Sequence, residues 1–369
     1  MGSETLGLDI FKSRTLYRLK AKQERRCCYP IEEADLLTLN ACVLCGSTLT
    51  STLTDVYLAG SLNFFSTSVC RECLYTFRSI SPSYQWFKKC WRMISKKQLE
   101  VFNPPLEAVR KARYEEYHRL LSKYVAAPSR VLDVGAGYGT GTRVFQNHGY
   151  RMDALETEDD KAYYIEHALR MPVHVTPLEE FILPGDPYGL VLFTHCLEHL
   201  DDPVRAMSRI RNLVDPRHGI LYLEVPIVWN SVTWSDALYL THKSNFTVEN
   251  LSRLVAEQGF HIVEHVWTRH TAEDPWDLGL VLKRVHDGPT LPPDPSDHHD
   301  ANDVRRLYRK GLPVSRPPAL ETVITYSVPR IDHFYQTIQL TANRLVDPPP
   351  GSAVISFESI EEERVDRGG

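Results

Sequence analysis

The sequence predicts an α/β fold in which a Rossmann-like sheet of seven strands follows a small cysteine-rich module. Three observations predict it. An apolar run ends in alternating glycines over residues 131–139, apolar strand patterns alternate with helical ones over 126–284, and two C-x-x-C motifs precede both. Because the chain has 369 residues, we expect more than one domain.

The first expected unit is an extension over residues 1–40, followed by a cysteine module over 41–80. Four cysteines form two C-x-x-C motifs separated by 24 residues: Cys42, Cys45, Cys70 and Cys73. Such paired motifs bring four thiolates to one tetrahedral ion, which predicts structural Zn²⁺. Two C-x-x-C disulfides are the alternative, but neither motif lies in a thioredoxin-like βαβ setting. The strand-like residues 53–65 would bring the motifs together as the tips of a hairpin.

A helical linker is expected over residues 81–125. Its last helix, over 106–123, carries Tyr114 and Tyr117 three residues apart and therefore on one face. These tyrosines either cover a ligand bound at the glycine turn or pack on the sheet.

The glycine turn opens the main domain, which we expect over residues 126–284. An apolar strand at 131–134 leads into Gly135, Gly137 and Gly139, and a helix follows over 140–148. Glycines at alternate positions let a ligand lie against bare backbone. The spacing matches neither the G-x-G-x-x-G of dinucleotide sites nor a P-loop. Glu156, 21 residues after Gly135, ends the second strand over 150–156, where a carboxylate can accept hydrogen bonds from ribose hydroxyls.

The third strand and its turn are expected over 172–181, and the fourth strand runs over 189–194 into Leu197-Glu198-His199. With these motifs the chain resembles the class I S-adenosylmethionine (SAM) dependent methyltransferases. The resemblance implies SAM as cofactor. It also implies a set of cofactor-binding residues, namely Asp133, Gly135, Ala136, Gly137, Gly139, Glu156, Leu178, Glu179, Thr194, His195 and Tyr117.

The cysteine module in front of such a domain is similar to the zinc-ribbon methyltransferases that modify deoxysugars and related natural products, often at carbon. Tyr239, His242 and Phe246 fit a motif that this group carries after the fifth strand. The resemblance implies a small-molecule acceptor. Because histidine can remove a proton near neutral pH, His242 is the first candidate for the catalytic base, with His195 and Tyr239 as further catalytic candidates.

The remaining elements complete the sheet. A fifth strand is expected over 220–226, a helix capped by Thr247 follows, and strands over 260–266 and 278–282 form an antiparallel pair at one edge. A proline-rich linker over 285–300 leads to a carboxy-terminal extension over 301–369, with one or two helices within 301–346.

Composition limits the function. The net charge of −5 argues against a nucleic-acid partner. No apolar run reaches the roughly 20 residues of a membrane span, and residues 1–26 do not have the pattern of a secretory signal. We therefore expect a cytoplasmic protein with no membrane partner. Two alternatives remain: an RNA-binding protein or RNA base methyltransferase that grips RNA through the cysteine module and basic amino end, and a non-catalytic scaffold.

Overall fold

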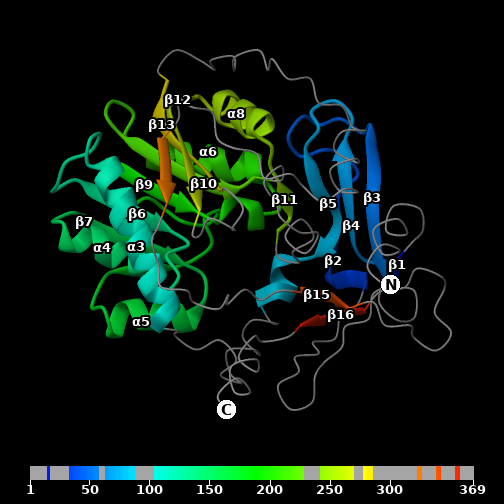
Figure 1. The fold of residues 1–369 in the computed structure, drawn as a ribbon, viewed down its shortest axis with the longest axis horizontal. Coiled ribbons are helices and arrows are strands. Elements are labelled where there is room, and N and C mark those ends of the chain that lie inside the picture. Colours follow the sequence, from blue (N-terminus) through cyan, green and yellow to red (C-terminus); the bar gives the residue numbers. More distant parts are fainter. Residues whose placement is uncertain are drawn as a thin grey trace.

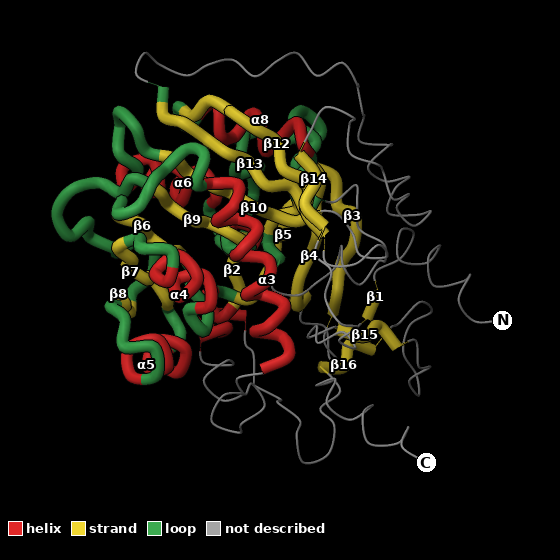
Figure 2. Tube along the Cα trace, turned by 60° about the vertical axis from the view of Figure 1, so that its left-hand side comes forward, coloured by secondary structure: helices red, strands yellow, loops and turns green. Residues whose placement is uncertain are grey.

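The structure is a computed structural model (Figure 1). It describes residues 15–16, 33–57, 63–88, 104–227, 242–269, 277–285, 322–325, 338–341 and 354–357. Two sheets dominate this part of the chain, and helices pack on the larger one (Figures 1 and 2).

The larger sheet has the strand order β14-β12-β13-β10-β9-β6-β7-β8. Its strands are β6 (Arg130–Val134), β7 (Arg151–Glu156), β8 (Val173–Val175), β9 (Leu190–Thr194), β10 (Ile220–Pro226), β12 (Phe260–Arg269), β13 (Asp277–Arg284) and β14 (Thr322–Thr325). From β8 to β10 all pairings are parallel, whereas β13 is antiparallel to both of its neighbours. The carboxyl ends of β6, β7, β9 and β10 therefore meet at one edge, where open α/β sheets bind ligands.

Helices cover both faces of this sheet because its central strands are apolar on both sides. On one face, α3 (Pro104–Leu121), α4 (Thr140–Asn147) and α5 (Asp159–His167) pack against residues such as Val131 and Leu192. On the other, α6 (Pro203–Leu213) and α8 (Val248–Glu257) pack against residues such as Leu132 and Val191. Successive side chains along β6 and β9 point to opposite faces of the sheet, so each belongs to the hydrophobic core on one face or the other.

The second sheet belongs to the cysteine module, with strand order β1-β3-β4-β5-β11 and β2 beside β5. The strands are β1 (Thr15–Leu16), β2 (Leu36–Thr38), β3 (Thr50–Tyr57), β4 (Asn63–Cys70), β5 (Thr76–Pro82) and β11 (Ser244–Asn245). Strand β11 comes from the main domain, 162 positions after the end of β5, and pairs antiparallel with it. Buried Tyr75 and Phe77 belong to the same hydrophobic cluster as the sheet residue Phe193. The module and the main domain are therefore packed together.

Most of the expected elements are confirmed. The seven strands form as predicted, with β12 and β13 antiparallel, and β14 adds an eighth strand that pairs in parallel outside β12.

Within 301–346, where we expected one or two helices, only residues 322–325 and 338–341 are described. These residues form strands β14 and β15 (Ile338–Thr341), the latter paired with β16 (Val354–Phe357), and the expected helices lie outside the described residues. The expected linker over 285–300 lies outside the described residues apart from residue 285.

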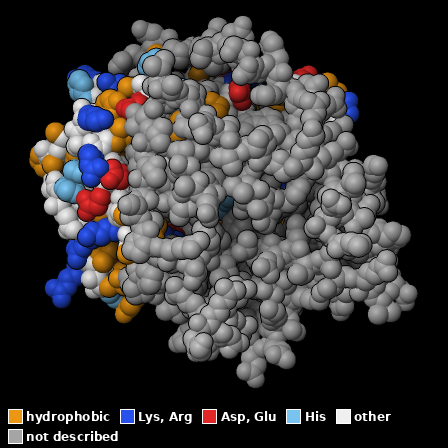
Figure 3. All heavy atoms as spheres, in the orientation of Figure 1, with side chains coloured by type: hydrophobic (Ala, Val, Ile, Leu, Met, Phe, Trp, Pro, Cys, Tyr) orange, Lys and Arg blue, Asp and Glu red, His pale blue; other side chains and the backbone are white. Residues whose placement is uncertain are grey.

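On the face drawn in Figure 3, the described side chains mix basic, acidic and apolar types. None of the helices in the described part of the chain has the length and apolarity needed to cross a bilayer.

Candidate functional site

The glycine turn joins β6 to α4 and is held in a left-handed conformation. Gly135, Gly137 and Gly139 have φ values of 71°, 57° and 71°, which side-chain-bearing residues rarely adopt. A Cβ atom on Gly135 would lie 2.1 Å from Cys196 Sγ, whereas a Cβ on Gly137 would have nothing within 4 Å. Gly135 is therefore required by packing, and Gly137 borders open space that a ligand can fill.

Four backbone N–H groups of the turn are used by the protein itself. Gly135 and Ala136 donate to the carbonyl of Leu155, and Gly139 donates to that of Ala136. Gly137 donates to Glu156 Oε2 at 2.7 Å. Beside these bonds the turn offers a ligand open space at Gly137 and a nearby carboxylate.

Glu156 lies at the carboxyl end of β7, and its side chain is 6% exposed. Its Oε1 accepts from the N–H groups of Thr157 at 2.6 Å and Glu158 at 2.9 Å. Burial raises the pKa of Glu156, although Lys161 and the N–H donors oppose that rise. The carboxylate is thus fixed in orientation and retains lone pairs for a ligand hydroxyl.

Asp133 is a second buried carboxylate beside the turn, with 1% exposure. Thr142, in the first turn of α4, donates to its Oδ2 at 2.8 Å. Its Oδ1 has no hydrogen-bond partner among the described residues. Burial raises the pKa of Asp133 to about 6. A buried unpaired carboxylate oxygen is costly unless a ligand donor reaches it.

The two linker tyrosines have different surroundings. The Tyr114 ring lies against Gly141, where an added Cβ would come within 2.4 Å of it, and its hydroxyl is 3.0 Å from Thr194 Oγ1 at the end of β9. Tyr117 is fully buried, donates to Glu224 and packs on Tyr222 with ring centroids 4.8 Å apart. The geometry therefore corrects the expected contact: Tyr114, and not Tyr117, borders the turn.

The residues expected near an adenine lie after β8. Leu178 is buried, and the carbonyl of Glu179 accepts from Arg209 at 2.7 Å. Tyr84 lies in a helical stretch over 84–88. Burial raises the pKa of its hydroxyl, and the negative charges of Glu156 and Glu179 raise it further, which places Tyr84 near both carboxylates. Its buried hydroxyl has no hydrogen-bond partner among the described residues. Tyr84 is thus a ligand-contact candidate that the sequence alone did not single out.

His195 follows β9 directly and sits among carboxylates. Its Nε2 lies 2.9 Å from Glu224 Oε1 and 3.5 Å from Asp277 Oδ2, and its Nδ1 lies 3.7 Å from Glu198 Oε1. Burial by itself lowers the pKa of His195, but these three carboxylates outweigh burial and raise it to about 10. These carboxylates favour the protonated ring at neutral pH, which disfavours His195 as a base, and its catalytic role stays a prediction.

The backbone of His195 is also unusual, with φ of 51°. Its N–H donates to the carbonyl of Glu224 at 2.9 Å, which holds this conformation in place. A left-handed residue that is not glycine costs about 1–3 kcal/mol, and such residues concentrate at functional sites.

His242 lies near His199, with ring centroids 4.9 Å apart. Burial lowers the pKa of His242 to about 3, and His199 adds to that effect. The ring is therefore neutral at pH 7. It can accept a proton or a hydrogen bond, although it is a weak base. Tyr239, the third predicted catalytic residue, lies outside the described residues.

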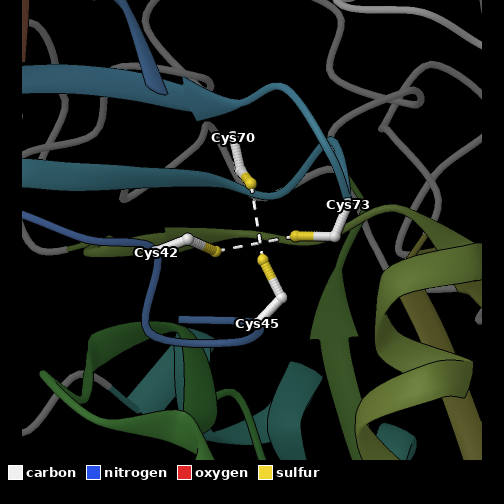
Figure 4. Close-up of side chains that lie close together, drawn as sticks. All are labelled: Cys42, Cys45, Cys70 and Cys73. Carbon is white, nitrogen blue, oxygen red and sulfur yellow. Dashed lines mark hydrogen bonds between the residues drawn. The ribbon is translucent and has the colours of Figure 1, made fainter. Parts of the chain in front are cut away.

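The four predicted metal-binding cysteines converge at the edge of the smaller sheet (Figure 4). The Sγ atoms of Cys42 and Cys73 are 3.6 Å apart and those of Cys45 and Cys70 are 3.5 Å apart. All four sulfur atoms lie within 4.8 Å of one another, and no disulfide joins them. With metal–sulfur bonds of about 2.3 Å, tetrahedral zinc separates its sulfur ligands by roughly 3.8 Å, so the cluster fits such an ion.

Sequence reasoning missed the carboxylates that surround His195. Glu224 and Asp277 lie on β10 and β13, and Arg113 of α3 approaches Glu224 Oε1 at 3.7 Å. These residues are far apart in the chain and come together only through the strand order. The position of Glu224 near the carboxyl end of the fifth strand was the one signal that could have found it.

A family model described as a methyltransferase domain matches residues 107–265. These residues include the glycine turn, Glu156, His195 and His242. A search of curated protein sequences gives no match.

Three solved structures are distantly similar. A SAM-dependent methyltransferase from Archaeoglobus fulgidus is 18% identical, covers 53% of this chain and 100% of its own, and has a TM-score of 0.43. One from Mesorhizobium loti is 16% identical, covers 47% and 98%, and has a TM-score of 0.40. The 1,6-didemethyltoxoflavin-N1-methyltransferase of Burkholderia thailandensis is 19% identical, covers 50% and 92%, and has a TM-score of 0.38. No substrate follows from likenesses this distant.

Proposed function

We propose that this chain, in which a methyltransferase domain matches residues 107–265, is a SAM-dependent methyltransferase that methylates a small molecule bound at the carboxyl ends of β9 and β10. The observation that carries this proposal is the glycine turn with the carboxylate of Glu156 fixed against Gly137 N. The turn and the carboxylate account for the cofactor, and the polar groups after β9 and β10 account for the acceptor.

The residues beside the turn fit SAM. Open space at Gly137 admits a ligand to the backbone, and Glu156 can accept from ribose hydroxyls. The unpaired Oδ1 of buried Asp133 suits a cationic donor such as an ammonium group. When bound, SAM supplies an electrophilic methyl carbon on a sulfonium, so the protein contributes position and exclusion of water.

Acceptor activation falls to His242 among the predicted catalytic residues. Its ring is neutral at pH 7, so it can accept a hydrogen bond from an acceptor hydroxyl and take the proton as methyl transfer makes that hydroxyl strongly acidic. His195 has a different task here. As an imidazolium tied to Glu224, it fixes the carboxylates of β10 and β13 and donates to an acceptor oxygen.

We also propose that the cysteine cluster holds structural zinc. Four thiolates leave no open coordination position, so the ion would stabilise the module without taking part in methyl transfer.

The charge of the chain supports a small-molecule acceptor over a nucleic acid. On the described part of the face in Figure 3, basic side chains are interspersed with acidic ones, and the net charge is −5. Nucleic-acid binding favours concentrated basic surface. RNA as an acceptor can be tested directly, because binding to it should weaken steeply as salt rises.

Calorimetric titration with S-adenosylhomocysteine tests the cofactor site. We expect Glu156→Gln to weaken binding by about tenfold or more, because the loss of a charged acceptor costs about 1.5–3 kcal/mol. The matched control is Glu166→Gln, since the Glu166 side chain is 64% exposed on α5 and should leave binding unchanged. Equal binding by wild type and Glu156→Gln would reject the assignment. Transfer of labelled methyl groups from SAM to a panel of small molecules, with RNA as a comparison, then tests the acceptor class.

A further inference from the structure

Glu198 has an unusual environment for a carboxylate. It lies in the short 3-10 helix η2 (Leu197–His199) that follows β9, and it is 1% exposed. Neither of its oxygens has a hydrogen-bond partner among the described residues. Removing an unpaired carboxylate from water is costly. His195 Nδ1 and His199 Nε2 each lie 3.7 Å from Glu198 Oε1, so the charge is partly balanced, but both distances are too long for a hydrogen bond and the carboxylate keeps lone pairs for a further ligand.

Two imidazole rings lie next to this carboxylate. One ligand-capable atom from each of Glu198, His199 and His242 lies within 4.8 Å of the other two. His199 Nε2 is 3.7 Å from Glu198 Oε1. The His199 side chain is 36% exposed, so the cluster can be reached from solvent.

The backbone fixes the spacing of the cluster. Lys243 N donates to the carbonyl of Glu198 at 2.7 Å, and the carbonyl of Lys243 accepts from Arg78 of the cysteine module. The Lys243 ammonium is anchored by Asp201 and by the carbonyl of Pro82. His242 is therefore held beside Glu198 by the main-chain contacts of the residue that follows it.

We propose that Glu198, His199 and His242 form a binding site for a divalent transition-metal ion. Two imidazoles and one carboxylate are the ligands of open zinc and non-haem iron sites, which keep positions for a substrate. Ligands bonded to such an ion at about 2.0–2.2 Å lie roughly 3–3.5 Å apart. The observed separations thus need only a small closure of the side chains.

The neighbouring cluster of His195, Glu224 and Asp277 is a poorer metal site. His195 Nε2 already bonds to Glu224 at 2.9 Å, and Tyr222 donates to the other oxygen of Glu224 at 2.6 Å. Both oxygens of Glu224 are therefore hydrogen-bonded, whereas among the described residues Glu198 has only the longer contacts with His195 and His199 and no hydrogen bond.

The site extends the proposed function, on which its catalytic role rests. Open positions on the ion would bind an oxygen atom of the acceptor and lower the pKa of an acceptor hydroxyl. His242 would then act through the metal, and the released proton would pass to solvent.

Titration of the whole protein with Mn²⁺, followed by electron paramagnetic resonance, tests the site, because Mn²⁺ prefers oxygen and nitrogen ligands to the thiolates of the cysteine cluster. We expect about one bound ion per chain. Glu198→Gln, His199→Asn and His242→Asn should each weaken binding by at least about tenfold, whereas His261→Asn, at an exposed position on β12, should not.

Binding of S-adenosylhomocysteine, measured on the same samples, separates the two proposals. Variants that keep it are folded, so a loss of Mn²⁺ binding in them supports the metal site. Two results would overturn the metal site. One is wild type that binds neither Mn²⁺ nor Zn²⁺ outside the cysteine cluster, and the other is Glu198→Gln that binds Mn²⁺ as tightly as wild type. Wild type that binds Mn²⁺ but not S-adenosylhomocysteine would sink the proposed function and leave the metal site standing.

Discussion

Gly135 and Gly137 lie two residues apart in one turn, but they meet different surroundings. Both have left-handed φ values, so a side chain at either costs about 1–2 kcal/mol. A Cβ on Gly135 also collides with Cys196 Sγ, whereas a Cβ on Gly137 enters open space. Stability and ligand binding therefore depend on different glycines of the same turn.

This difference gives a first prediction. Gly137→Ala should lower the free energy of unfolding by about 1–2 kcal/mol and weaken S-adenosylhomocysteine binding by about tenfold or more. Gly135→Ala should lose about 2–5 kcal/mol, because overpacking adds to the backbone cost. Adding Cys196→Ala to Gly135→Ala should recover the packing part, as denaturant unfolding can measure. No recovery in the double variant would contradict the collision.

Asp133 gives a prediction about pH. Its pKa is raised from 3.8 to about 6 in the folded protein, so the folded state holds the proton more tightly than the unfolded state. Ionisation therefore destabilises the fold as the pH rises from about 4 to 6, by on the order of 3 kcal/mol. Asp133→Asn should match wild type near pH 4 and be more stable by about that amount at pH 8, while binding S-adenosylhomocysteine more weakly.

Denaturant unfolding of both proteins across this pH range is the measurement. A stability difference that does not change between pH 4 and pH 8 would show that Asp133 titrates normally.

At the scale of single elements, α8 carries the predicted cap and more. Thr247 Oγ1 accepts from Asn250 N at 3.2 Å, and Asn250 Oδ1 accepts from Thr247 N at 2.9 Å. This reciprocal pair is a capping box. It fixes the start of α8 directly after β11 and His242.

Thr247→Ala should therefore lower the free energy of unfolding by about 1 kcal/mol. Thr247→Ser keeps the hydroxyl and serves as the matched control. Thermal and denaturant unfolding of the two variants measure this difference. An equal loss of stability in Thr247→Ala and Thr247→Ser would show that the hydroxyl does not stabilise the helix.

Elements were predictable where the signal is local. The glycine turn, the strand that ends at Glu156 and the Thr247 cap each depend on residues close in sequence, and the structure confirms these elements. Strand β11 has only two residues, too few for any periodic pattern. The carboxylates around His195 come from separate strands, so only the strand order reveals them. The roles of the site residues in binding and catalysis remain predictions.

At the scale of the whole molecule, the cysteine module and the main domain share one hydrophobic cluster. Cys42 and Cys70 are buried in it together with Phe193 of β9 and Leu251 of α8. A shared core couples the stability of its parts. We therefore expect the module and the domain to unfold together.

Cys42→Ser tests this coupling. Zinc content should fall by about one ion per chain, and thermal unfolding should shift to lower temperature as one transition for the whole chain. Cys196→Ser is the control for zinc content, because Cys196 bonds to the carbonyl of Val134 and lies outside the cluster. Two separate transitions in Cys42→Ser would show that the module melts independently.

The crossover of β11 has a consequence for dividing this chain. Because Ser244 and Asn245 complete the sheet that Thr76 and Phe77 begin, no single cut separates the two parts. A fragment restricted to residues 126–284 would keep the candidate catalytic histidines but lose Arg78, whose backbone N–H donates to the carbonyl of Lys243. It would also expose an unpaired edge, which invites aggregation. A chimaera designed to accept a different substrate would therefore have to exchange the cysteine module together with the segment between β10 and α8, which contains β11.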